Sequence, residues 1–258
     1  MTGAALASSV RAPTGPGDSA SGRFQEKKLG WLSDIHLNFL SESEVRRFFG
    51  QLAASDVDGW LVSGDIGEVR SVAGYLRLFA TELPCRTYFV LGNHDCYGGS
   101  LAGVRAEMER LSRQSDRLVW LTASDPQAPG DCVAIVGDDG WGDGRFGNAR
   151  RTPVELNDFL LIDELAGLTR QALVRTLNTW GDQAAARLVP WFACQATGEA
   201  ILACAKDSPR TDFLVLCGHT HGGGVHAPAP NVVVHTAAAE YGTPEVQRSF
   251  EFETRAEP

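Results

Sequence analysis

The chain has 258 residues, of which 43% are hydrophobic and 21% charged, and its formal net charge is −9. This length and balance suit one large globular domain with a substantial core. The acidic balance argues against non-specific binding to nucleic acid or to an anionic membrane, because both surfaces attract clustered Lys and Arg.

The first 23 residues are rich in Ala, Ser, Gly and Pro and lack the apolar block of a secretory signal. We expect a disordered tail over residues 1–26 and one folded domain over residues 27–258. No window approaches the roughly 18 apolar residues of a membrane span. The six cysteines form no CxxC pair, which favours reduced thiols and a cytoplasmic protein.

From Lys28 onward, short apolar runs alternate with stretches of helical periodicity, which is typical of an α/β domain. Three strands are expected first, each followed by a helix. Their sequences are LGWLSD (29–34), GWLVSGD (59–65) and TYFVLGN (87–93). Ser41 and Glu44 have the spacing of a capping box, which predicts that the first helix begins there.

The pattern then changes. LVWLT (118–122) and CVAIVG (132–137) are joined by a loop too short for a helix, so we expect them to pair as antiparallel strands. Residues 155–206 have helical periodicity with breaks near Gly181 and Pro190. Three further strands end the chain: DFLVLCG (212–218), NVVVHTA (231–237) and SFEFE (249–253).

Four of these strands end in residue types that bind metals: SDIH, SGD, GNHD and CGHTH. Catalytic groups in α/β sheets gather where strands end, because the packed strand holds the first residues of the loop. Asp34 and His36 are two residues apart, as are His219 and His221, the two histidines of the GHTH motif, so in extended backbone each pair faces one side. Each pair can therefore meet one ion or two adjacent ions.

These motifs, in this order, resemble those of the calcineurin-like metallophosphoesterases: DxH, GD, GNH[DE], an isolated His, and GHxH. Here they are Asp34-Ile35-His36, Gly64-Asp65, Gly92-Asn93-His94-Asp95 and Gly218-His219-Thr220-His221. Four short motifs in order are a strong signal, although each alone is weak. The resemblance covers about residues 29–240. It implies an α/β fold, a four-layer αββα sandwich of two mixed β-sheets with flanking helices and metals at one end.

The resemblance also implies two divalent ions. The expected ligands are Asp34, His36 and His221 for the first ion, Asn93 and His219 for the second, and Asp65 between the two. Carboxylate, imidazole and amide ligands suit Mn, Fe, Zn or Co alike. Two cations about 3.5–4 Å apart can neutralise a phosphate ester and activate a water molecule for attack.

By the same resemblance, His94 would protonate the leaving alkoxide and Asp95 would orient it. The loop GDDGWGDGR adds weaker candidates. Asp138, Asp139 and Asp143 follow a strand end and could reach the site, but turn residues need no function. Arg145 is a candidate contact for the substrate phosphate.

One motif of the family is missing, because no histidine occurs between His94 and His219. The strand that would carry it is also missing, since the chain runs at about Leu188 straight into helical periodicity. The second site is thereby reduced to three ligands, and the backbone beside the lost strand needs new partners. As substitutes, His226 is more typical of a surface loop, and His235 of a hydrogen-bonded structural histidine.

Two functions therefore stay open: a phosphoesterase acting on phosphate mono- or diesters at a dinuclear site, or a catalytically impaired homologue that binds a single metal or a phosphorylated ligand. A nuclease is disfavoured by the acidic balance. We expect a small phosphorylated substrate and no membrane partner, while the oligomeric state is left open.

Overall fold

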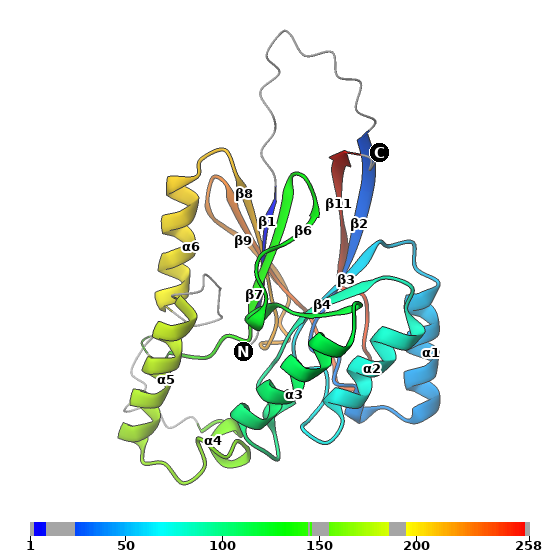
Figure 1. Ribbon diagram of the computed structural model, residues 1–258. Coiled ribbons are helices and arrows are strands. Elements are labelled where there is room, and N and C mark those ends of the chain that lie inside the picture. Colours follow the sequence, from blue (N-terminus) through cyan, green and yellow to red (C-terminus); the bar gives the residue numbers. More distant parts are fainter. Residues whose placement is uncertain (1–2, 9–23, 144, 146–154, 186–194, 256–258) are drawn as a thin grey trace.

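The computed structural model describes residues 3–8, 24–143, 145, 155–185 and 195–255, which form two stacked β-sheets between layers of helices (Figure 1). The first sheet has five strands, in the spatial order β11 (Arg248–Arg255), β2 (Phe24–Leu32), β3 (Gly59–Ser63), β4 (Arg86–Val90) and β5 (Leu118–Trp120). Strands β2 to β5 are parallel and β11 is antiparallel to β2. Between them run the helices α1 (Glu42–Ala53), α2 (Val72–Glu82) and α3 (Leu101–Gln114).

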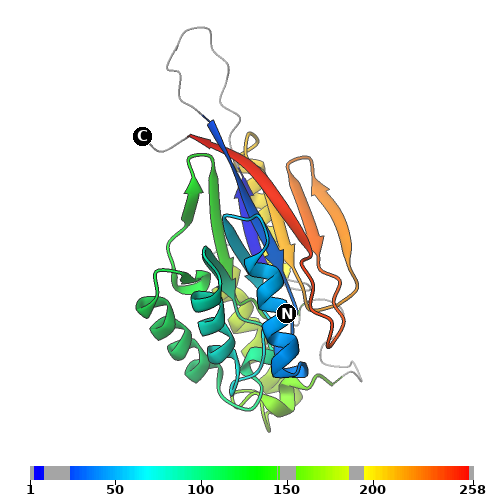
Figure 2. The same ribbon diagram turned by 90° about the vertical axis from the view of Figure 1, so that its right-hand side faces the viewer.

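The second sheet has six strands and is also mixed. Its spatial order is β6 (Gln127–Gly130), β7 (Val133–Asp138), β1 (Gly3–Ser8), β8 (Asp212–Cys217), β10 (Val232–Thr236) and β9 (Gly224–Ala229). The β9–β10 hairpin forms one edge, as Figure 2 shows. The described residues between β7 and β8 in the chain include three helices, α4 (Asp158–Leu161), α5 (Arg170–Ala185) and α6 (Gln195–Asp207).

Three groups of buried side chains hold the layers together. Between the sheets lie Leu29, Trp31, Leu61 and Val90 from one side and Val133, Ile135 and Leu216 from the other. Helices α1 to α3 cover the outer face of the five-stranded sheet, with Phe48, Leu52, Phe79 and Met108 buried there. Ile201 and Ala205 of α6 cover Val215 and Val232 of the six-stranded sheet. This confirms the α/β fold with two mixed sheets and flanking helices.

Helix α1 begins as the sequence predicts. The Ser41 hydroxyl accepts a hydrogen bond from the Glu44 backbone N–H at 3.4 Å, and the Glu44 carboxylate accepts one from the Ser41 N–H at 2.8 Å. The capping box thus satisfies two of the backbone donors that a helix N-terminus leaves unpaired. The loop that follows β2 is thereby tied to the start of α1.

The expected pairing of residues 118–122 with residues 132–137 is wrong. Leu118–Trp120 is strand β5 and pairs with β4 in the five-stranded sheet, whereas β7 lies in the other sheet. The loop between them supplies β6, which forms the hairpin with β7. The expected break at Gly181 is also absent, because α5 continues to Ala185; a single Gly costs a helix about 1 kcal/mol and does not end it.

The prediction of a disordered tail over residues 1–26 is wrong for residues 3–8 and 24–26, the parts of that range that the structure describes. Gly3–Ser8 forms β1 in the middle of the six-stranded sheet, and β2 begins at Phe24. The physical reason is that β7 and β8 each present backbone groups that β1 pairs. Residues 9–23, and the junction at Leu188 where a strand was expected to be lost, lie outside the described residues.

No helix in the described ranges combines the length and the apolar composition of a membrane span. The described cysteines are free thiols: Cys85, Cys96, Cys132, Cys204 and Cys217.

A buried carboxylate, Asp139, joins the end of β7 to the five-stranded sheet. Its side chain is 1% exposed, and one oxygen accepts hydrogen bonds from the Leu91 N–H (2.8 Å), the Trp120 indole (2.9 Å) and the Thr122 hydroxyl (2.8 Å). The other oxygen lies 3.0 Å from Arg105 Nε. Since Leu91 immediately precedes the GNHD motif, this residue holds that loop in place and has a structural role.

Replacing Asp139 by Ala should lower the free energy of unfolding by about 3–5 kcal/mol, because three donors and one guanidinium lose their buried partner. The matched control is Glu109→Ala, which removes an exposed pair with Arg113 and should cost about 0.5 kcal/mol or less. Urea denaturation of both variants measures the difference. Equal losses would contradict a buried anchoring role for Asp139.

Candidate metal centre

The loops that follow β2 and β3 run side by side at one end of the five-stranded sheet. The Asp34 N–H donates to the Gly64 carbonyl at 3.1 Å and the His36 N–H to the Asp65 carbonyl at 2.9 Å. The loop after β8 reaches this place from the other sheet, because the His219 N–H donates to Asp34 Oδ1 at 2.7 Å. The strand ends that the sequence singled out therefore do meet.

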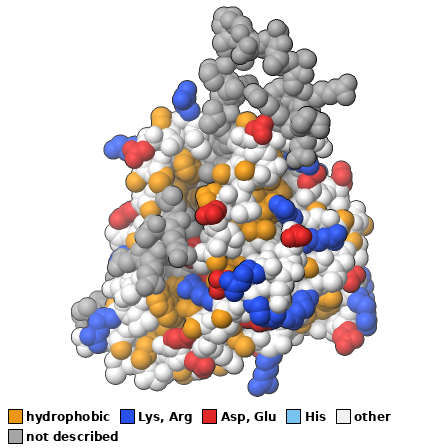
Figure 3. Space-filling view, in the orientation of Figure 1, with side chains coloured by type: hydrophobic (Ala, Val, Ile, Leu, Met, Phe, Trp, Pro, Cys, Tyr) orange, Lys and Arg blue, Asp and Glu red, His pale blue; other side chains and the backbone are white. Residues whose placement is uncertain are grey.

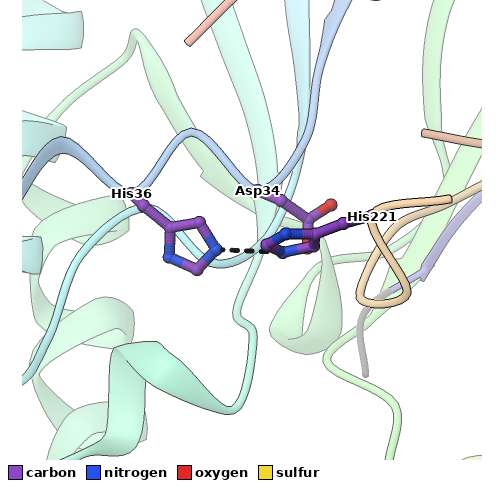
Figure 4. Close-up of side chains that lie close together, drawn as sticks. All are labelled: Asp34, His36 and His221. Atoms are coloured by element: carbon purple, nitrogen blue, oxygen red, sulfur yellow. Dashed lines mark hydrogen bonds and ion pairs between the residues drawn. The ribbon is translucent and has the colours of Figure 1, made fainter. Parts of the chain in front are cut away.

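Three of the expected ligands converge on one point (Figure 4). The metal-binding atoms of Asp34, His36 and His221 all lie within 4.8 Å of one another. Nε2 of His36 is 3.3 Å from Nε2 of His221, which in turn is 3.7 Å from Asp34 Oδ1. Asp34 and His36 are buried, at 2% and 0% exposed. Two imidazole nitrogens and a carboxylate that point at one another suit a divalent cation between them.

The backbone at the ligands is unusual. Five non-glycine residues have positive φ among those described: Asp34 (50°), His36 (39°), Asp65 (51°), His219 (77°) and His221 (56°). All five are predicted metal ligands. The assumption of extended backbone within the DxH and GHTH motifs is therefore wrong, although Asp34 and His36 still reach the same point. A left-handed backbone at such residues costs about 1–3 kcal/mol each and is typical of functional sites.

The electrostatics of the site favour a bound cation. Burial, and next the nearby charge of Asp65, raise the pKa of Asp34, while hydrogen bonds from Ser33 and from the His219 N–H act in the opposite direction. Burial lowers the pKa of His36 to about 3, followed by the charge of His94. The His36 imidazole is thus neutral at pH 7, with a nitrogen lone pair available for a metal. A cation would offset the repulsion between the two carboxylates.

Two motif glycines allow the carboxylates to come this close to the backbone. A Cβ atom at Gly218 would lie 1.9 Å from Asp34 Oδ2 and 2.2 Å from Ser33 Oγ. At Gly92 it would lie 1.9 Å from Asp65 Oδ1. Both positions therefore exclude any side chain while the carboxylates keep their places.

The orientation of Asn93, expected in the second site, depends on two residues that the sequence analysis missed. Its amide nitrogen donates to Tyr97 Oη at 2.9 Å and to Asp158 Oδ1 at 2.8 Å. The Tyr97 hydroxyl also donates to Asp158 Oδ1 at 2.6 Å. Because the nitrogen is used in this network, the carbonyl oxygen of Asn93 is the atom that can serve as a metal ligand.

His94 is positioned by ring contacts and through its own backbone. Its ring lies 4.3 Å from that of Tyr97 and 4.6 Å from that of His36, centroid to centroid. Its N–H donates to Asp65 Oδ1 at 2.9 Å. The side chain of Asp95, expected to orient His94, instead accepts bonds from the N–H groups of Ile66, Gly67 and Gly92 (2.8–2.9 Å). Asp95 thus joins the GD and GNHD loops, and Tyr97 contacts the ring.

A cavity of about 270 Å³ opens beside these residues. Its lining contains five of the predicted site residues, namely Asp65, Asn93, His94, His219 and His221, and six others, namely Tyr97, Glu155, Leu156, Asn157, Asp158 and Tyr241. Tyr97 follows the GNHD motif within three residues and could have been proposed on that ground. Asp158 and Tyr241 stand in no motif: Asp158 is 65 residues from Asn93 in the chain, and Tyr241 follows the GHTH motif only after a loop and a hairpin.

The other candidates lie elsewhere. Arg145 is not among the described residues that line the cavity, and its guanidinium is 3.5 Å from Asp143 Oδ2. Asp143 also accepts a bond from the Ala196 N–H at the start of α6. His226 lies exposed in β9 rather than in a loop. His235 is buried in β10, 3.4 Å from an Arg248 nitrogen, as expected of a structural histidine.

Comparison with known proteins decides the family. The sequence profile of the calcineurin-like phosphoesterases matches residues 27–223. The chain belongs to this family. A search of curated proteins found no match. As a calcineurin-like phosphoesterase, the protein is a metal-dependent hydrolase of phosphate esters.

Two solved structures are similar to this phosphoesterase. A phosphopantetheinyl hydrolase from Mycobacterium tuberculosis has a TM-score of 0.57 and 14% sequence identity, over 84% of this chain and 90% of that chain. A dimetal phosphatase from Danio rerio has a TM-score of 0.45 and 15% identity, over 84% of this chain and 89% of that one. The likeness to the first supports the fold alone.

Gly218→Ala should weaken Mn²⁺ binding by about 10–100-fold, because the new Cβ displaces the Asp34 carboxylate. Gly74→Ala is the matched control: a Cβ there meets nothing within 4 Å, and Ala in the first turn of α2 should stabilise the helix by up to about 1 kcal/mol. Isothermal titration with Mn²⁺ compares the two. Unchanged affinity in the Gly218 variant would show that Asp34, at its position in the structure, does not bind the ion.

Tyr97→Phe keeps the ring beside His94 but removes the hydroxyl that bonds Asn93 and Asp158. We expect Mn²⁺ affinity to fall by about 10–100-fold at the predicted second site, since Asn93 loses one of its two hydrogen-bond partners. The same change at Tyr88, in the core between the sheets, should leave both binding and turnover unchanged. The idea fails if the two variants behave alike.

Proposed function

We propose that this metal-dependent phosphoesterase hydrolyses phosphate mono- or diesters at a dinuclear centre. The observation that carries the proposal is the pair of buried carboxylates, Asp34 and Asp65, set among imidazoles at four strand ends. Asp34, His36 and His221 would hold one divalent ion. Asn93 and His219 would hold the second, and Asp65 would bridge them.

The donor set fits these ions. Burial, followed by surrounding positive charge, lowers the pKa of His219 to about 2, so this ring too is neutral at pH 7. Mixed oxygen and nitrogen donors favour Mn, Fe, Zn or Co. When bound, two such ions supply positive charge that neutralises the ester and acidifies the attacking water. The second ion would be held more weakly, because the family's isolated histidine has no counterpart in the sequence.

His94 is the group best placed to donate a proton to the leaving alkoxide. It lines the cavity and is partly exposed, while the rings of Tyr97 and His36 restrict its orientation. The backbone N–H of His94 bonds to Asp65, so that the acid and the bridging carboxylate keep a constant separation. Such positioning is what general acid catalysis requires.

A small phosphorylated substrate is the best match for a cavity of about 270 Å³. On the face seen in Figure 3, Lys and Arg side chains are interspersed with Asp and Glu, which does not favour tracking along a nucleic acid backbone. The free thiols of the described cysteines support a reducing compartment such as the cytoplasm as part of this proposal.

A second candidate function rests on one specific observation. Within the described part of the chain, the group of three or more His, Cys, Asp or Glu side chains that could hold a metal is Asp34, His36 and His221 alone. A homologue that binds one ion, or a phosphorylated ligand, with little turnover would also have this arrangement. Hydrolysis above the buffer background that requires Mn²⁺ would rule it out.

Asp65→Asn should lower Mn²⁺-dependent hydrolysis of p-nitrophenyl phosphate and bis(p-nitrophenyl) phosphate on the order of 10²–10³-fold, since the bridging charge is lost. Asp56→Asn, at an exposed position outside the site, is the control and should keep full activity. The ratio of the hydrolysis rates of the two substrates distinguishes a monoesterase from a diesterase. Retained activity in the Asp65 variant would refute the proposed centre.

A further inference from the structure

Strand β1 lies in the interior of the six-stranded sheet although it comes from the other end of the chain. Each of its six residues is in register with one residue of β7 and one of β8, antiparallel to both. The two neighbours are separated in the chain by residues 139–211. The described elements between them are helices α4, α5 and α6. In the described structure, the place between β7 and β8 is therefore filled by β1 and not by a segment close to either strand in sequence.

The sheet depends on this strand. Without β1, the β6–β7 hairpin and the β8–β10–β9 unit share no strand pairing, because β1 alone joins them in the strand order. Six residues on each side would lose their ladder partners, and unpaired backbone groups in a buried sheet are costly. Ile135 and Leu216, both 0% exposed, flank the opening and would be uncovered.

One end of β1 lies beside the metal centre. Gly3 is in register with Asp138 of β7 and with Cys217 of β8. The next residue after Asp138 is the anchoring Asp139, and the next after Cys217 is Gly218, where the GHTH loop begins. The ladder through β1 therefore connects the anchor of one loop to the start of the other.

We infer that the space between β7 and β8 is a peptide-binding site, and that its occupant is the segment Gly3–Ser8 of this same chain. The segment acts by strand complementation: extended backbone supplies the ladder, and its sequence GAALAS contains no His, Asp or Glu that could bind a metal. It supplies strand pairing on both sides, and it brings no counterpart of the family's isolated histidine. The inference needs no catalysis and is independent of the proposed function.

The first test uses amide hydrogen exchange on the full chain. Residues 3–8 and the facing amides of β7 and β8 should exchange at least on the order of 100-fold more slowly than an unstructured peptide. Exchange of residues 3–8 at the rate of an unstructured peptide would overturn the inference.

The second test separates the segment from the folded body after folding. A site-specific protease sequence is inserted between Ser8 and Phe24, the chain is cut, and a fluorescent peptide of residues 1–10 is added in excess. The body should retain the cut segment in gel filtration and exchange it for the labelled peptide. A peptide with Ala5→Pro, which cannot donate its ladder bond, should not enter. Failure of the unmodified peptide to bind, or equal binding of both, would contradict strand complementation. Neither readout involves metal or turnover, so the two proposals fail separately.

Discussion

The site is organised around two carboxylates buried close to each other. Asp34 and Asp65 are 2% and 1% exposed, and burial, followed by the charge of Asp65, raises the pKa of Asp34. Such an arrangement is unfavourable unless positive charge lies between the groups. Its neighbours maintain the arrangement: Gly92 and Gly218 leave the space, backbone N–H groups of His94 and His219 bind the oxygens, and left-handed backbone turns the ligands inward. The family's metal dependence follows from this constraint.

Loops from both sheets hold the two carboxylates in place. Asp95 joins two loops of the five-stranded sheet through three backbone N–H groups, and Asp139 joins the end of β7 to the strand before GNHD. The GHTH loop comes from β8, which is joined to β7 only through β1, the strand that lies between them in the described sheet. A substitution far from the predicted metal ligands in sequence can therefore alter their positions through the end of a strand.

Much of this could be predicted from the sequence, because strands that end in ligand residues leave a local pattern. The four motifs marked loops that lie together in the structure, and apolar periodicity located α1 to α3 and most strands. The remainder depended on contacts between distant segments. Asp158 bonds Asn93 across 65 residues, β1 pairs with strands more than 120 residues away, and left-handed φ at Asp and His has no signature in sequence. Local spacing predicted that Leu118–Trp120 pairs with β7, but the two strands lie in different sheets.

The central claim is that this set of side chains holds two ions with unequal strength, and equilibrium dialysis against increasing Mn²⁺ with elemental analysis tests it most directly. The account predicts two ions per chain at high Mn²⁺ and one after desalting, with His219→Ala removing the weaker ion and Asp34→Asn the tighter one. A ratio that never exceeds one ion per chain, or a His219 variant that binds as the unaltered protein does, would contradict it.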